Sequence, residues 1–261
     1  MLSILITHYG RPDSIVECLE RIRALDLSMP FEIIVSDDGS DSKTQQFLKT
    51  LKIDTLLLSE ENKGLASNLN KGLNACRGNY ILYIQEDFLV QENFVDVIEE
   101  SFNLLKDGTL DMIRYCANYR FKHLIPITKN INKIPRFSLQ NFNINTFQYS
   151  DNPFMTTPSF FARFGYFLED TSGGYGETEY AIRILNSSAK IGITNIYYFK
   201  HAANVASVMD VDTNKIKSKK RKGIKKKVWR FARALRQHLE WILYNPQNRR
   251  LYSYFNKRKA K

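Results

Sequence analysis

Short hydrophobic runs alternate with amphipathic segments through the first ninety residues of the chain. The runs have strand length, and in the segments between them apolar residues recur every three or four positions, as on one face of a helix. Such alternation indicates parallel strands joined by crossover helices. We therefore predict an α/β fold on a mainly parallel sheet. The predicted strands are residues 2–7, 31–36, 55–59 and 80–84, and the predicted helices are residues 11–25, a segment around 44–48 and residues 64–75.

The pattern changes in the second half. Residues 92–105 predict a helix and residues 110–115 a strand. Residues 117–158 lose their periodicity and are rich in Asn, Pro and aromatic residues, so we expect loops and meandering strands there, where substrate specificity often varies. A helix from Glu177 to about Leu185 and a last strand over 191–199 complete the predicted body.

Charge divides the chain in two. Residues 213–261 hold 18 Lys and Arg and one acidic residue, a net charge of +17, whereas residues 1–212 hold 20 basic and 26 acidic residues, a net charge of −6. We predict a catalytic domain over 1–213 and a basic tail over 214–261. A strongly basic tail indicates an anionic partner.

The tail has two parts. Residues 215–227 contain nine Lys and Arg, and residues 228–244 carry apolar side chains at helical spacing with a tryptophan near each end. A polybasic run beside an amphipathic helix is typical of attachment to an anionic membrane surface, which we predict for residues 215–244. The alternatives are a helix packed on the body or a solvated linker. RNA binding is disfavoured because no recognition motif accompanies the charge.

Cysteine usage and hydropathy bear on location. The three cysteines show no paired spacing, which argues against a disulfide framework or a zinc site and favours a reducing compartment. The N-terminus starts in a strand, with no signal-peptide pattern, and no run is long enough to span a bilayer. We expect a cytoplasmic protein on the inner face of the membrane.

Pairs of acidic residues follow two predicted strands. Asp37 and Asp38 follow the second strand, and Glu86 and Asp87 the fourth. Ligands of open α/β sheets bind outside the carboxyl ends of the strands. Asp37 or Asp38 could accept an N–H group of a nucleotide base, Glu86 could hold ribose hydroxyls, and Asp87 suits Mg²⁺ or Mn²⁺. Alternatively these acids form turns, cap helices or are solvated.

Further candidates lie elsewhere in the chain. Glu177, after the glycine-rich residues 173–176, could act as a general base, with Glu179 as the alternative, although both acids also suit a helix N-terminus. Tyr9 could stack on a base and Arg11 could pair with phosphate, or both could be surface residues of a loop. His201 follows the last predicted strand and is either a metal ligand or a structural residue.

Three segments together resemble glycosyltransferase family 2, inverting enzymes of the GT-A fold. SILITHYGRPDSIVECLERI is similar to the opening strand, loop and helix of that family, and EIIVSDDGSD to its Asp-Asp-Gly-Ser segment. NKGLASNLNKGLNACRGNYILYIQED is similar to the run that leads into its metal-binding acids. The resemblance covers about residues 1–205 and implies a three-layer GT-A-type fold with a mainly parallel central sheet.

The resemblance also implies roles for individual residues. It implies that the nucleotide-sugar is bound by Thr7, Tyr9, Arg11, Asp38, Gly64 and Glu86, that a divalent cation, Mg²⁺ or Mn²⁺, is held by Asp87 and His201, and that Glu177 is the catalytic base. The implied activity is transfer of a sugar from a nucleotide-sugar to a glycan or lipid-linked acceptor in cell-surface polysaccharide synthesis. We expect the acceptor over residues 150–176, against Phe154, Phe160, Phe161 and Tyr175.

The chain departs from the family pattern in three places. Gln85 stands at the first position of the usual Asp-x-Asp, Leu69 replaces a common arginine, and Gly176 precedes Glu177 where an acid is usual. A membrane-associated binding protein on a degenerate transferase fold therefore stays a rival. A nucleotidyltransferase is a second rival, although HYGRP is not the glycine-rich phosphate loop that it would need.

Overall fold

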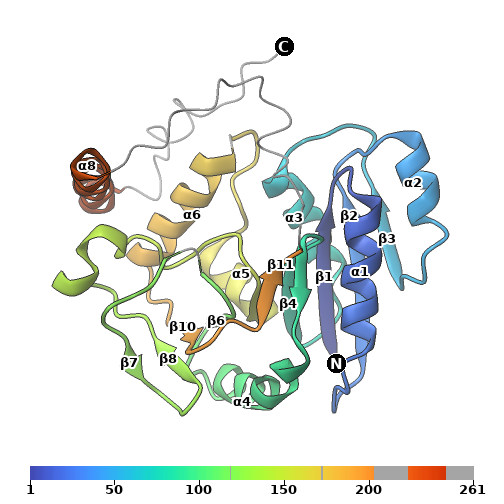
Figure 1. The fold of residues 1–261 in the computed structure, drawn as a ribbon, viewed down its shortest axis with the longest axis horizontal. Coiled ribbons are helices and arrows are strands. Elements are labelled where there is room, and N and C mark those ends of the chain that lie inside the picture. Colours follow the sequence, from blue (N-terminus) through green and yellow to red (C-terminus); the bar gives the residue numbers. More distant parts are fainter. Residues whose placement is uncertain (118, 172, 203–222, 245–261) are drawn as a thin grey trace.

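A mixed, largely parallel sheet forms the centre of the protein (Figure 1). The computed structural model describes residues 1–117, 119–171, 173–202 and 223–244. In spatial order its strands are β3 (Thr55–Leu58), β2 (Phe31–Asp37), β1 (Leu2–His8), β4 (Tyr80–Gln85), β9 (Phe154–Thr156), β6 (Met112–Arg114), β10 (Ile191–Thr194), β8 (Ile131–Lys133) and β7 (Ile125–Pro126). Strands β3, β2, β1 and β4 are parallel, β9 runs antiparallel between β4 and β6, and β10 is parallel to β6.

Helices cover both faces of this sheet. Side chains alternate along β1, so that Ile4 and Ile6 pack into one core and Leu5 into the other. The first core takes α1 (Pro12–Arg23), α2 (Ser42–Leu48) and α4 (Val95–Lys106), and the second takes α3 (Leu65–Ala75), α5 (Pro158–Phe164) and α6 (Gly173–Asn186). The predicted three-layer α/β architecture is confirmed.

Local sequence explains where the helices of the first half begin. Pro12 stands in the first turn of α1, where its missing N–H is not needed. Asp41 caps α2 by accepting a hydrogen bond from the Thr44 backbone N–H at 2.7 Å. Gly64 precedes α3 with a φ of +90°, a conformation that favours glycine.

A second, two-stranded sheet corrects one prediction. Residues 191–199 are not a single strand, because β10 ends at Thr194 and β11 (Phe199–His201) pairs instead with β5 (Phe88–Val90). The Thr194 hydroxyl donates to the Ile196 carbonyl at 2.6 Å and closes a turn between the two strands. The 3₁₀ helix η1 (Glu92–Phe94) follows β5 and leads into α4.

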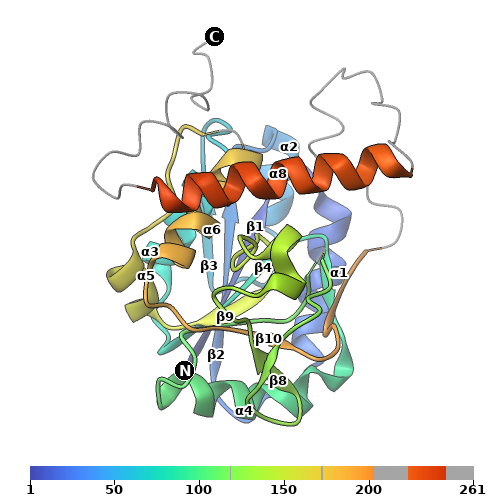
Figure 2. The same ribbon diagram turned by 90° about the vertical axis from the view of Figure 1, so that its left-hand side faces the viewer.

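The predicted tail helix exists as α8 (Ile224–Ile242). It lies across one side of the body, where it contacts α6 and the 3₁₀ helix η2 (Leu139–Ile144) (Figure 2). Ala234 and Gln237 are buried in this contact, and the Thr146 hydroxyl donates to Gln237 Oε1 at 3.0 Å. The predicted boundary at residues 213 and 214, and residues 215–222 of the basic run, lie outside the described residues.

Candidate active site

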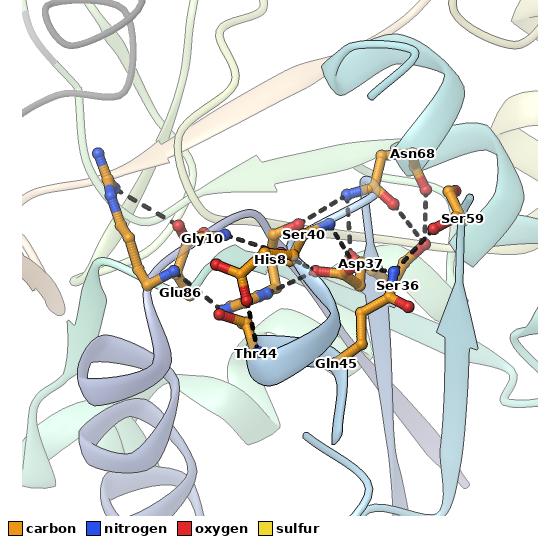
Figure 3. Close-up of polar contacts among 12 residues, drawn as sticks. His8, Gly10, Ser36, Asp37, Ser40, Thr44, Gln45, Ser59, Asn68 and Glu86 are labelled. Atoms are coloured by element: carbon orange, nitrogen blue, oxygen red, sulfur yellow. Dashed lines mark hydrogen bonds and ion pairs between the residues drawn. The ribbon is translucent and has the colours of Figure 1, made fainter. Parts of the chain in front are cut away.

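The carboxyl ends of β1 and β2 meet in a buried hydrogen-bonded network around Asp37 (Figure 3). Asp37 accepts hydrogen bonds from His8 Nδ1 at 2.8 Å and from the Ser40 backbone N–H at 2.9 Å. Burial alone would raise the pKa of Asp37, but these hydrogen bonds outweigh it and lower the pKa. Of the two neighbouring acids Asp37 and Asp38, Asp37 is therefore the one that builds the turn after β2.

Asp38 lies beside Gly64. Its Oδ1 accepts a hydrogen bond from the Lys63 backbone N–H at 2.9 Å, and its Oδ2 accepts one from the Gly64 N–H at 2.8 Å. Two residues that are 26 positions apart in sequence therefore share one place at the rim of the sheet.

Arg11 and the acids after β4 form a second cluster. Arg11 Nη1 lies 2.9 Å from Asp87 Oδ2 and 3.5 Å from Glu86 Oε1. The pairing of β11 with β5 brings His201 opposite Phe88, and its Nδ1 lies 3.9 Å from Asp87 Oδ2. Sequence alone could not place His201 there, because the contact depends on a short strand pair 113 residues apart.

Thr7 and Tyr9 complete the β1 end. The Thr7 hydroxyl lies 3.2 Å from the Tyr83 hydroxyl in the buried interior, and the Thr7 carbonyl accepts a hydrogen bond from the Glu86 N–H at 3.2 Å. Tyr9 is half-buried in the loop after β1. The Thr7 side chain points into the core, so its backbone is the part that reaches the rim.

Glu177 lies next to a residue that the sequence analysis did not single out. Asp151 donates its backbone N–H to Glu177 Oε1 at 3.3 Å, and Gln85 Nε2 donates to the Asp151 carbonyl at 2.9 Å. Because Gln85 ends β4, just before the acids that face Arg11, this link joins the Glu177 side of the rim to the Asp87 side.

Glu179, the alternative base, is fully buried and forms an ion pair with Arg183, whose Nε lies 3.0 Å from Glu179 Oε1. A carboxylate enclosed by this pair has no path to a substrate. Of the two acids on α6, only Glu177 is left as a candidate.

The chain is similar in sequence to known glycosyltransferases. The family model described as "Glycosyl transferase family 2" matches residues 3–169. The chain is 30% identical over 122 residues to chondroitin synthase of Escherichia coli, an alignment that covers 45% of this chain and 17% of that protein. The chain spans about a third or less of the length of the curated relatives that it matches.

The chain belongs to glycosyltransferase family 2. Its fold is shared by many solved structures, including two that contain a nucleotide-sugar. TarS of S. aureus in complex with UDP-GlcNAc superposes with a TM-score of 0.58 at 13% identity, over 97% of this chain and 78% of that one. The Pyrobaculum calidifontis mannosyltransferase PcManGT, in complex with GDP-Man and Mn²⁺, gives a TM-score of 0.53 at 18% identity, over 75% and 54%. The predicted GT-A-type fold is confirmed.

Two departures from the family 2 pattern have a structural reason in this chain. Gln85, in place of the first acid, is the donor that holds the Asp151 carbonyl. At position 176 a Cβ atom would lie 2.6 Å from Thr171 Oγ1, so the acid that usually precedes the base does not fit unless Thr171 moves.

The two neighbouring acids Asp151 and Glu177 of this candidate site carry shifted pKa values. Burial, and then the charge of Glu177, raises the pKa of Asp151 to about 8. Burial also raises the pKa of Glu177, against the hydrogen bond from Asp151 and the charge of Arg114.

One expected acceptor surface is wrong. Phe154, Phe160 and Phe161 are almost completely buried, because β9 lies inside the sheet and α5 covers it. They form core and offer no stacking surface to an acceptor. The side chain of Tyr175 lies outside the described residues.

Proposed function

We propose that this chain is an inverting glycosyltransferase that moves a sugar from a nucleotide-sugar donor to a glycan or lipid-linked acceptor. The observation that carries the proposal is the link across the rim, in which Gln85 connects Asp151 and Glu177 to the strand that ends at Glu86 and Asp87. A donor-side cluster and a candidate base in one rim are what a direct displacement at a sugar carbon needs.

The donor side would use the residues around β1 and β2. Asp38 and Gly64 would line the base pocket, with Tyr9 stacking beside them. Glu86 would accept the ribose hydroxyls, and Arg11 would turn from Asp87 toward the diphosphate, which its guanidinium can bind with two parallel hydrogen bonds. The fold likeness to TarS in complex with UDP-GlcNAc supports a nucleotide-sugar of this kind.

A divalent cation fits Asp87 and His201. Asp87 Oδ1 is buried and has no hydrogen-bond partner among the described residues, which is what an absent cation would leave. In the described part of the chain, no group of three or more His, Cys, Asp or Glu side chains could hold a metal. Mg²⁺ and Mn²⁺ sites of this type take one or two protein ligands and complete their shell with substrate phosphates and water. The cation would stabilise the negative charge of the leaving nucleotide.

Glu177 would take the proton from the attacking acceptor hydroxyl. A raised pKa makes the ionised Glu177 carboxylate a stronger base than a solvated glutamate. The hydroxyl would then attack the anomeric carbon from the face opposite the diphosphate, and inversion would follow.

The role in cell-surface polysaccharide synthesis is supported by relatives named chondroitin synthase and poly-beta-1,6-N-acetyl-D-glucosamine synthase. No described helix is both long and apolar enough to cross a membrane. We propose peripheral attachment to an anionic membrane surface through 215–244, with the acceptor on the same side. An exposed apolar stripe along α8 supports this attachment (Val228, Leu235, Leu239 and Ile242).

Glu177→Gln tests the mechanism. Nucleotide release from a panel of nucleotide-sugars should fall about 10²–10⁴-fold, because general base catalysis contributes on that order. Donor binding, followed by thermal shift, should persist. Glu20→Gln, on the exposed face of α1, is the matched control and should match wild type. Release unchanged by Glu177→Gln would remove the proposed base.

A further inference from the structure

A cavity of about 620 Å³ lies between α8, η2 and the segment after β6. We call it the α8 cavity. None of the described residues that line it is acidic. Its basic lining residues are Arg120, Lys122, Lys227, Arg230 and Arg233.

These five cations have no protein counter-charge in the described structure. The ion pair of α8 joins Arg236 to Glu240, and among described residues none joins a lining cation to a carboxylate. Like charges gathered in one hollow repel each other and produce a positive potential, so an anion that enters is stabilised.

Arg233 supplies a separate observation. Its guanidinium lies over the rings of Tyr119, at 5.6 Å, and Phe147, at 5.0 Å, which fix its orientation. Its Nε is buried and has no hydrogen-bond partner among the described residues. A buried donor held in this way indicates an acceptor that the protein itself does not provide.

The other lining residues suit a glycan. Arginine forks favour phosphate, with two parallel hydrogen bonds to its oxygens. The amides of Gln140 and Asn143 can bond hydroxyls, and the Tyr119 and Phe231 rings are apolar surfaces for sugar rings. The lining therefore matches a ligand with both phosphate and sugar groups.

The cavity is on the base side of the rim. Ile144 lines it, and Asp151, seven residues later, contacts Glu177, so the two sites are at most about 25 Å apart along an extended chain. Phe147, whose ring lies under Arg233, accepts a hydrogen bond from Arg114 at its carbonyl at 2.7 Å, and the charge of Arg114 acts on Glu177. The donor-side residues follow β1, β2 and β4, away from the segment after β6.

We propose that the α8 cavity binds the phosphate groups of a phosphate-bearing glycan acceptor. This inference rests on the proposed function, since it assigns the acceptor of that site. On this proposal α8 takes part in substrate recognition. Its exposed apolar stripe would contact the membrane, and its residues that line the α8 cavity would contact the acceptor.

The test uses fluorescence of the full chain, because its two tryptophans, Trp229 and Trp241, both lie on α8. Tripolyphosphate is titrated with EDTA present at 0.15 M NaCl, and a saturable change is expected. In the cavity variant Arg120→Gln/Lys122→Gln/Arg230→Gln the dissociation constant should rise at least tenfold. The control Lys217→Gln/Lys219→Gln/Lys220→Gln removes equal charge from the basic run that precedes α8 in the sequence. It should change the dissociation constant less than threefold. Equal weakening in both variants would overturn the proposal.

Two further arms identify the source of the phosphate. With phosphatidylglycerol vesicles present, the tripolyphosphate response should persist, and its loss would assign the cavity to lipid headgroups and overturn the proposal. In transfer assays the cavity variant should raise KM for a phosphorylated glycan and leave KM for its dephosphorylated form unchanged. Equal KM changes for both forms would contradict recognition of phosphate.

Thermal shift with Mn²⁺ and a panel of nucleotide-sugars that includes UDP-GlcNAc, on the same samples, keeps the two claims apart. A tripolyphosphate response without binding of any nucleotide-sugar would reject the proposed function and leave the anion site. Donor binding without a tripolyphosphate response would reject the anion site in the α8 cavity and leave the proposed function.

Discussion

At the scale of single residues, the most informative pair is Asp151 and Glu177. The sequence analysis pointed to Glu177, whereas Asp151 lies in the stretch without periodicity and carries no motif. Tyr149 donates its hydroxyl to Asp151 Oδ1 at 2.8 Å, which holds the buried carboxyl in place beside the candidate base. The surroundings of the Glu177 carboxylate therefore include a neighbour, Asp151, that only folding brings close.

Asp151→Asn should flatten the pH dependence of stability. An unfolded aspartate ionises near pH 4 and the folded Asp151 near pH 8, so the folded state binds more protons between these values. The free energy of unfolding of the wild type therefore falls as pH rises through this window, by up to about 5 kcal/mol. Asparagine cannot ionise, so Asp151→Asn should lose less stability between pH 5 and pH 8.5 in urea titrations.

Asp26→Asn removes an exposed carboxyl and is the matched control, which should follow the wild-type pH dependence. Parallel curves for Asp151→Asn and wild type would show that Asp151 is ionised in the folded protein at neutral pH.

At the scale of elements, α8 carries two faces with different partners. Ala234 and Gln237 face the body and are buried, whereas Leu235 and Leu239 are 45% and 58% exposed. The periodicity of the tail predicted the helix and its apolar stripe, but not which side would meet η2 and α6. Packing on the body and attachment to a membrane, which the sequence left as alternatives, are compatible because they use different faces.

Leu235→Gln/Leu239→Gln should weaken co-sedimentation with phosphatidylglycerol vesicles at least about tenfold. Each leucine loses on the order of 1 kcal/mol of burial in the bilayer, since about half of its surface is free in the protein. Ile125→Gln/Ile196→Gln, which are 40% and 52% exposed elsewhere on the surface, is the control and should bind as wild type does. Full binding by the α8 variant would argue against the membrane proposal.

At the scale of the whole molecule, the sheet gathers its acids at one rim. Parallel β1, β2 and β4 all end there, so Asp38 and Asp87 lie on the same side although 49 positions separate them. Antiparallel β9 begins there instead, which explains how Asp151, just before β9, reaches Glu177.

Donor and cation should stabilise the whole fold together. With a matching nucleotide-sugar and Mn²⁺ at about 100 times the dissociation constant, mass action adds about 2.7 kcal/mol. For a chain of this size that corresponds to a rise in Tm of roughly 5–10 °C. Asp87→Asn should abolish the part of the Tm rise that depends on Mn²⁺. Asp96 is an exposed acid on α4, and Asp96→Asn should keep the full rise. A rise independent of Mn²⁺ in the wild type would remove the metal role.

The sequence by itself determined the strands and helices of the first half, the acids at their ends and the amphipathic tail, because hydrophobic periodicity and turn residues act over a few positions. Only the tertiary structure decided that Asp37 builds a turn while Asp38 joins Gly64, that His201 meets Asp87 through β11, and that Asp151 accompanies Glu177. It also divided residues 191–199 between two sheets and buried the expected acceptor phenylalanines. These outcomes depend on contacts between distant segments and on burial, which no local pattern encodes.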